Sequence, residues 1–240
     1  MTRLKSVLSF LLVVLAYHAS AHYIWIELGS APQTGKSLEV RIYYGEFNEG
    51  VREISGGRLE ELDGIVAWVI GPDGKQTKLN ISIEEKYFKT SFVPDQPGQY
   101  LIQAVNTVRP VVDWSKFDIG VVRPVYYTTK EVAVGNAKNT PPTFEIPGDA
   151  AVVIASTREK NTFRILFKGQ PLANAKVLFH APNEWSKELK TDDKGLVSFT
   201  PIGSGQYIVE CIYAEKVPGN FKGTAYEAIR HRGTTAVDIR

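Results

Sequence analysis

The chain has 240 residues, with 28 Lys+Arg against 26 Asp+Glu, and 43% of its residues are hydrophobic. Its single cysteine, Cys211, excludes a scaffold held by intramolecular disulfides, so hydrophobic cores must stabilise the fold. The nearly balanced charge and the lack of a basic run give no electrostatic footprint for nucleic acid.

The first 21 residues predict a secretory signal peptide. Arg3 and Lys5 precede a mostly apolar stretch over residues 6–17, and Ala19-Ser20-Ala21 has the small-x-small pattern that signal peptidase reads. The apolar stretch is shorter than the ~20 residues that a membrane-spanning helix needs. We therefore expect cleavage between Ala21 and His22, a periplasmic or secreted protein, and no membrane span in the mature chain.

The rest of the sequence predicts an all-β protein. Segments rich in β-branched and aromatic residues alternate with Gly- and Pro-containing turns, which is typical of β-sandwiches. The expected strands cover residues 38–44, 65–70, 99–105, 124–134, 162–167, 176–180, 196–199, 206–213 and 234–239. Cys211 lies on an alternating face of one of these segments, so we expect it to be buried.

A polar, proline-rich stretch over residues 136–150 predicts a linker between two domains in tandem. The N-terminal domain would span residues 22–135 and the C-terminal domain residues 151–240. Each part has about 100 residues, the usual size of an immunoglobulin-like sandwich. The segment FKGQPLANAKVLF (167–179) and the later Gly-Gln-Tyr strand resemble transthyretin-like and carboxypeptidase-regulatory-like modules, which implies a transthyretin-like C-terminal sandwich.

The sequence contains none of the common catalytic signatures. There is no nucleophile elbow, phosphate loop, dinucleotide fingerprint or His-Glu-x-x-His motif. Paired carboxylates such as Glu60-Glu61 and Glu84-Glu85 are interpreted as solvated surface. We therefore expect a protein that is not an enzyme and that has no catalytic residues.

The histidines are the strongest candidates for a functional site. His22, His180 and His231 remain after cleavage. The α-amine of an N-terminal histidine has a pKa of ~8, and the amine and ring Nδ1 can chelate one metal ion. A further histidine nitrogen would complete a site suited to Cu(II) or Ni(II), with His231 as the preferred second ligand and His180 as the third. The alternative is an incidental histidine at the cleavage point and two packed or surface histidines.

Two other features are weaker candidates. Glu46 follows an expected strand at a glycine turn and is either an oxygen ligand or, as we prefer, solvated. Tyr23 and Trp25 share one face of the first strand, and Trp114 and Trp185 lie in loop-like segments. Exposed aromatics would suit a metal-free module that binds glycan or protein, although packing in a core is the more frequent role.

Five segments together resemble one family: residues 22–29, 41–62, 72–75, 169–177 and 226–240. They are similar to exported bacterial domains of unknown function described as nickel-uptake-associated, or NikM-like, periplasmic proteins. The resemblance implies a metal-related role, with a membrane uptake system for nickel or cobalt as partner. His22 and His231 match the recurrent histidines of that family.

From the sequence we therefore expect an exported protein that binds a nickel, cobalt or copper ion through His22, His231 and His180. The rival hypotheses are the metal-free binding or adhesion module and a copper enzyme of the oxidase kind, which would need an open coordination position.

Overall fold

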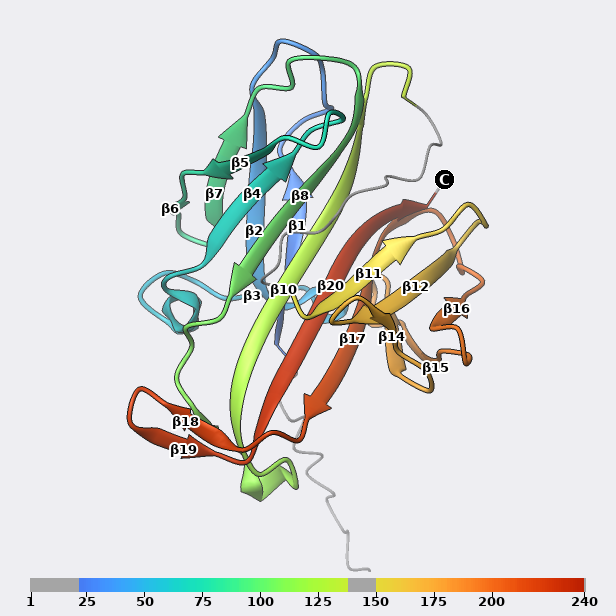
Figure 1. Cartoon of the computed structure of the whole chain (residues 1–240). Helices are drawn as coiled ribbons and strands as arrows, with labels where there is room; N and C mark the ends of the chain where they lie inside the picture. Colours follow the sequence, from blue (N-terminus) through green and yellow to red (C-terminus); the bar gives the residue numbers. More distant parts are fainter. Residues whose placement is uncertain (1–21, 138–149, 240) are drawn as a thin grey trace, which may run out of the picture.

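The computed structural model describes residues 22–137 and 150–239 (Figure 1). The predicted all-β class is confirmed, because this part of the chain consists of β-strands, loops and short 3-10 helices. None of its helices has the length and apolar character needed to cross a membrane. The expected signal peptide and residues 138–149 of the expected linker lie outside the described residues.

Nine strands form one long sheet, which we call the shared sheet because both halves of the chain contribute to it (Figure 1). Its order is β15-β14-β17-β20-β10-β8-β4-β5, with β9 paired to β10. The strands are β4 (Val66–Ile70), β5 (Gln76–Leu79), β8 (Gly98–Asn106), β9 (Val112–Asp113), β10 (Val121–Val134), β14 (Lys176–His180), β15 (Ser186–Lys190), β17 (Gly205–Glu215) and β20 (Ala228–Ile239).

Two smaller sheets cover the shared sheet. The N-terminal sheet contains β1 (Tyr23–Leu28), β2 (Leu38–Glu46), β3 (Val51–Arg52), β6 (Ser82–Ile83) and β7 (Phe88–Phe92). The C-terminal sheet contains β11 (Val152–Ser156), β12 (Thr162–Phe167), β13 (Gln170–Pro171) and β16 (Leu196–Ser198). A hairpin, β18 (Gly219–Phe221) and β19 (Thr224–Tyr226), and three 3-10 turns, η1 (Phe47–Glu49), η2 (Arg58–Leu62) and η3 (Ser115–Phe117), complete the described chain.

The halves of the chain meet at the pairing of β10 with β20, which lie side by side in parallel. Val122 is opposite Ala228, and Thr129 is opposite Thr235. Parallel neighbours need a long connection between them, and here residues 135–227 supply it. The sandwich layers expected from the sequence are present, but the central sheet runs without interruption from one half into the other.

The two covering sheets pack on opposite faces of the shared sheet. Along β10, Tyr126 belongs to the core beneath the N-terminal sheet, whereas its neighbours Val125 and Tyr127 belong to the core beneath the C-terminal sheet. This alternation is the period of two that a strand imposes on its side chains. The expected burial of Cys211 is confirmed, because it lies fully buried in the second core.

Strand β20 begins earlier than expected. The sequence predicted a last strand over residues 234–239, but β20 starts at Ala228 and pairs with β17 along its whole length. His231 therefore lies within a strand and not in the loop before it. As a consequence, Arg230 and Arg232 point to one face of the shared sheet and His231 points to the other.

Strand β1 is buried on both faces. Ile24 and Ile26 enter the core of the N-terminal sheet, while Tyr23 and Trp25 pack on the shared sheet. Packing, the role expected more often for Tyr23 and Trp25, is confirmed, and the alternative of an exposed aromatic surface does not hold for them, since they are only 1% and 0% exposed. Figure 1 shows β1 behind the long β10 strand, where the two halves of the chain meet.

A buried ion pair holds the start of β1 in place. Arg232 donates from Nε to Glu210 and from Nη1 to the His22 carbonyl oxygen, at 2.7 Å for the second bond. Two residues along β20, Thr234 Oγ1 donates to the Ile24 carbonyl oxygen at 2.6 Å. Burial alone would raise the pKa of Glu210, but the charge of Arg232 and the hydrogen bond from His180 lower it to about 2.

We predict that Glu210→Gln lowers the free energy of unfolding by about 3–5 kcal/mol at neutral pH, because it leaves Arg232 buried without its counter-charge. The ionised Glu210 stabilises the native protein fully above pH 4.5, and this stabilisation is lost as the pH falls from 4.5 towards 2. Urea denaturation at several pH values should therefore show a flatter acid dependence in the variant. Glu188→Gln, at an exposed ion pair with Lys176, is the matched control; equal losses in the two variants would contradict the prediction.

Candidate functional site

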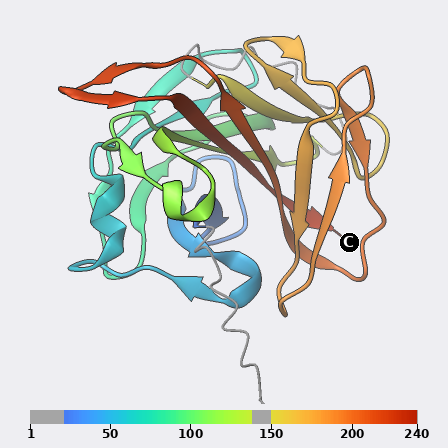
Figure 2. The same ribbon diagram turned by 90° about the horizontal axis from the view of Figure 1, so that it is seen from below.

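A cavity of about 800 Å³ opens between the shared sheet and the segments that contain η2 and η3. The view from below shows η2 in cyan and η3 in green around the ends of β1 and β2 in blue (Figure 2). His22 lines this cavity together with aromatic, acidic and basic side chains, among them Tyr44, Tyr126, Trp114, Glu61, Arg58, Arg109, Arg230 and Arg232.

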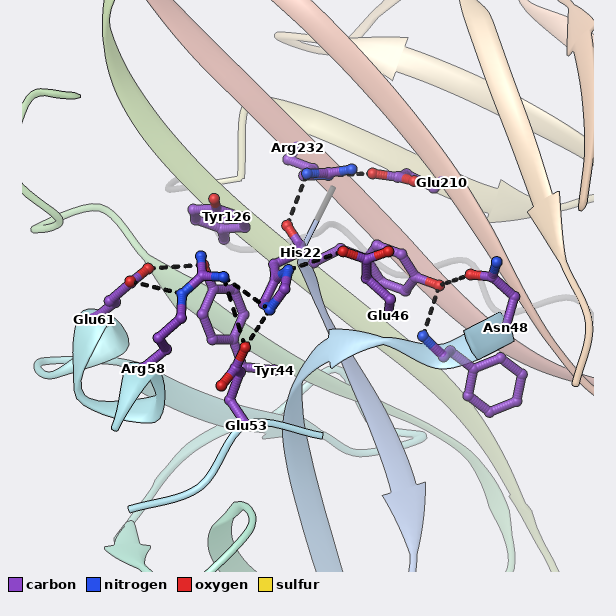
Figure 3. Close-up of polar contacts among 12 residues, drawn as sticks. His22, Tyr44, Glu46, Asn48, Glu53, Arg58, Glu61, Tyr126, Glu210 and Arg232 are labelled. Atoms are coloured by element: carbon purple, nitrogen blue, oxygen red, sulfur yellow. Dashed lines mark hydrogen bonds and ion pairs between the residues drawn. The ribbon is translucent and has the colours of Figure 1, made fainter. Parts of the chain in front are cut away.

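His22 lies between two carboxylates at the start of β1 (Figure 3). Its ring Nδ1 is 3.0 Å from Glu46 Oε1, and its Nε2 contacts Glu53 Oε1 and lies 3.1 Å from Arg58 Nη1. The ring packs edge-on against Tyr44 with 5.2 Å between centroids. Since the two ring nitrogens point in divergent directions, the two carboxylates hold the ring from opposite sides and fix its orientation.

The expectation that Glu46 is solvated is wrong. Glu46 is the last residue of β2 and is only 9% exposed. Gly45 makes this possible: its φ is +149°, and a Cβ there would collide with the Val51 carbonyl oxygen. The chain can therefore fold back closely as β3 and bring Glu53 to the other side of His22.

His231 lies on the opposite face of the shared sheet from the cavity. Its Nδ1 is 3.0 Å from the Tyr127 hydroxyl, and its Nε2 is 3.1 Å from Glu215 Oε2. Burial lowers the pKa of the imidazole, against the opposing effect of Glu215. The ring also packs against Phe167 of the C-terminal sheet. This histidine thus belongs to the core and polar contacts of the C-terminal half.

His180 ends β14 and belongs to a third set of contacts. Its Nε2 is 2.9 Å from Glu210 Oε2, and its ring stacks on Tyr23 with 5.0 Å between centroids. Its Nδ1 is buried and has no hydrogen-bond partner among the residues that the structure describes. Tyr23 points away from His22 across β1, so His180 lies on the far side of that strand from the His22 ring.

The structure does not bring the three predicted ligands together. Each histidine has its own carboxylate partner: Glu46 and Glu53 for His22, Glu210 for His180, and Glu215 for His231. Within residues 22–137 and 150–239, no group of three or more His, Cys, Asp or Glu side chains is arranged to hold a metal ion. Of the three, His22 is the histidine that lines the cavity.

The arginines of the cavity were not predicted from the sequence. Arg109 donates from Nη1 to the hydroxyls of Tyr44 and Tyr126, at 2.9 and 2.6 Å, and from Nη2 to Glu61. Glu61 also accepts from Arg58, so the expectation that it is merely solvated is wrong. The order Arg-His-Arg at residues 230–232 was the available signal in the sequence. It places both arginines on one face only when these residues belong to a strand, which requires β20 to begin at Ala228.

The two tryptophans assigned to loops have different roles. Trp114 directly precedes η3, lines the cavity and lies 5.5 Å from the Arg230 guanidinium, measured to its ring centroid. Trp185 lies next to β15 and packs edge-on against Tyr207, 6.1 Å between centroids. Trp114 is therefore the tryptophan that a ligand in the cavity would meet.

Comparisons with known proteins give one family match. Residues 19–215 match the family described as "Domain of unknown function (DUF4198)". No curated protein sequence gives a significant match.

Two solved structures are similar at low identity. One is a DUF4785 family protein from Legionella pneumophila subsp. pneumophila, at 11% identity and a TM-score of 0.32, covering 81% of this chain and 53% of that one. This chain thus spans about half the length of the Legionella protein. The other is a marsupial T cell receptor, at 11% identity and a TM-score of 0.24, covering 89% of this chain and 74% of that one. Because the family match extends over most of the sequence, the chain belongs to the DUF4198 family of domains of unknown function.

Proposed function

We propose that this chain is an exported protein, periplasmic or secreted, that binds a transition-metal ion through His22 and Glu46. The observation that carries the proposal is the close approach of His22 Nδ1 and Glu46 Oε1, which lie 3.0 Å apart at the end of a buried strand. Two ligand atoms at ~2.0–2.1 Å from one ion and at right angles to each other are about 2.9 Å apart. The observed separation matches that spacing.

Cleavage before His22 would supply a third donor. The α-amine and Nδ1 of one histidine close a six-membered chelate ring, and the Glu46 carboxylate adds an oxygen. Two nitrogens and one oxygen suit the tetragonal coordination preferred by Cu(II) and Ni(II). This ligand set replaces the His231 and His180 of the sequence hypothesis with Glu46, because those histidines lie in other networks.

The residues on the far side of the ring support this site. Glu53 and Arg58 contact His22 Nε2, the nitrogen that the proposed ion does not use. Contacts of this kind fix the orientation of a ligating imidazole and adjust its basicity. We expect Glu53 to act as a positioning residue, with an effect on metal affinity smaller than that of Glu46.

The resemblance to nickel-uptake-associated proteins supports a role in metal handling. A protein that holds nickel, cobalt or copper at a site near its surface would pass the ion to a membrane uptake system. Three donors from the chain leave coordination positions for water or for an exchanging ligand, as transfer of the ion requires.

A titration of the mature chain, residues 22–240, with Ni(II), Co(II) and Cu(II) tests the proposal directly. One added glycine ahead of His22 removes the amine from the chelate, so we expect the affinity to fall at least about tenfold. Calorimetry on the two forms measures the difference. Equal affinities would show that the N-terminal chelate does not form.

Single substitutions separate the two candidate ligand sets. Glu46→Gln should weaken metal binding by about tenfold or more, whereas Glu53→Gln should weaken it less, since Glu53 lies at the other ring nitrogen. His180→Ala and His231→Ala should leave the affinity within about threefold of the native value. A loss with His231→Ala as large as the loss with Glu46→Gln would favour the ligand set expected from the sequence.

A further inference from the structure

The cavity beside His22 has an excess of positive charge. Three of the side chains that line it are acidic and five are basic. The acidic ones are Glu60, Glu61 and Asp63, and the basic ones are Arg58, Arg109, Lys222, Arg230 and Arg232. Its volume of about 800 Å³ lies within the ~300–1,000 Å³ that is usual for small-molecule sites.

Most of these charges already have partners. Arg109 and Arg58 share Glu61, and Arg232 is paired with Glu210. Lys222 Nζ donates to the Val108 carbonyl oxygen at 3.3 Å. The hydrogen bonds of Arg109 to two tyrosine hydroxyls saturate one side of its guanidinium, so these groups form a fixed, positively charged wall.

Arg230 differs from the other arginines. Arg230 is half-buried, and within the described part of the chain its guanidinium forms no hydrogen bond or ion pair. Its described contact is with the face of Trp114. A guanidinium carries five N–H donors, and since those of Arg230 line the cavity and are not among the buried unpaired groups of the described residues, they are accessible to an acceptor that enters it. The nearby cations Arg109 and Arg232 add positive potential at Arg230, which favours an anion beside it.

Part of the cavity wall is apolar. Val112, Trp114, Phe117, Ile119 and Ile212 line the same cavity as Arg230. Inorganic phosphate would leave this wall in contact with water, whereas an organic acid would cover it. A planar guanidinium pairs with a carboxylate through two parallel hydrogen bonds, and the flat Trp114 ring beside it suits a flat or aromatic body.

We propose that this cavity binds a small organic carboxylate, whose carboxylate pairs with Arg230 and whose apolar body lies against Trp114 and Phe117. The site lies beside the proposed metal site but does not depend on it, because Arg230, Trp114 and Phe117 are not among the proposed metal ligands. Arg109 and Arg232 add a favourable potential without giving up their own partners.

Calorimetric titration of the mature chain, freed of metal on a chelating resin, tests this site with benzoate and phenylacetate. We expect both acids to bind and to raise the melting temperature, and the matching amides, benzamide and phenylacetamide, to bind at least about tenfold more weakly. Inorganic phosphate should bind more weakly than either acid. Amides that bind as tightly as the acids, phosphate that binds as tightly as benzoate, or no binding of either acid at millimolar concentration would overturn the proposal.

Substitution of Arg230 tests whether its guanidinium is the group that binds the carboxylate. Arg230→Met should weaken benzoate binding about tenfold to a hundredfold, since it removes a charge-assisted pair. Arg164→Met, at an exposed position on β12, is the matched control and should leave benzoate binding unchanged. Arg230→Lys keeps the positive charge but loses the planar guanidinium that pairs through two hydrogen bonds, so we expect intermediate benzoate affinity. This variant tests the assignment if Arg230→Met fails to fold. Native affinity in a folded Arg230→Met or Arg230→Lys variant would refute the assignment.

Discussion

The parallel pairing of β10 with β20 is the constraint on which the other features depend. It places Tyr126 opposite Arg232 and Val125 opposite His231, and so decides which side chains of β20 face the cavity. A slip of one residue would exchange the two faces and turn His231 towards His22. The register is held by cores on both sides of the sheet, because each face of β10 contributes a buried tyrosine, Tyr126 on one side and Tyr127 on the other.

Strand β1 is the second element that this register fixes. It lies across the shared sheet and is held there by hydrogen bonds from Arg232 and Thr234 to its backbone. His22, the residue directly before the strand, is thereby held at the wall of the cavity and beside Glu46. A proposed metal site and a proposed anion site therefore lie side by side, the first built on His22 and the Glu46 carboxylate and the second on Arg230.

The sequence predicted the strands well because their signals are local. Alternating β-branched and aromatic residues, punctuated by Gly and Pro turns, located the strands at 162–167 and 176–180 with the bounds observed. The start of β20 was missed because the stretch Ala228–Gly233 is charged and lacks the usual apolar alternation. Its strand conformation comes from long-range partners, β10 on one side and β17 on the other.

The site was predicted only in part, because long-range strand pairing brings several of its residues together. His22 was singled out by its place after the cleavage signal, which is a local feature. Glu46 and Glu53 reach it through the glycine-dependent return of β3, and Arg230 reaches the cavity through a pairing of distant strands. Histidine scarcity suggested that the three histidines converge, but scarcity carries no information about which face of a sheet each one occupies.

Anomalous X-ray diffraction from crystals of the mature chain grown with Ni(II) or Cu(II) tests the central claim most directly. The proposed site predicts one strong peak within bonding distance of His22 Nδ1, of the His22 amine and of Glu46 Oε1. A peak at His231 or His180, or an N-terminal histidine ring that remains bound to Glu46 with no metal beside it, would contradict the proposal.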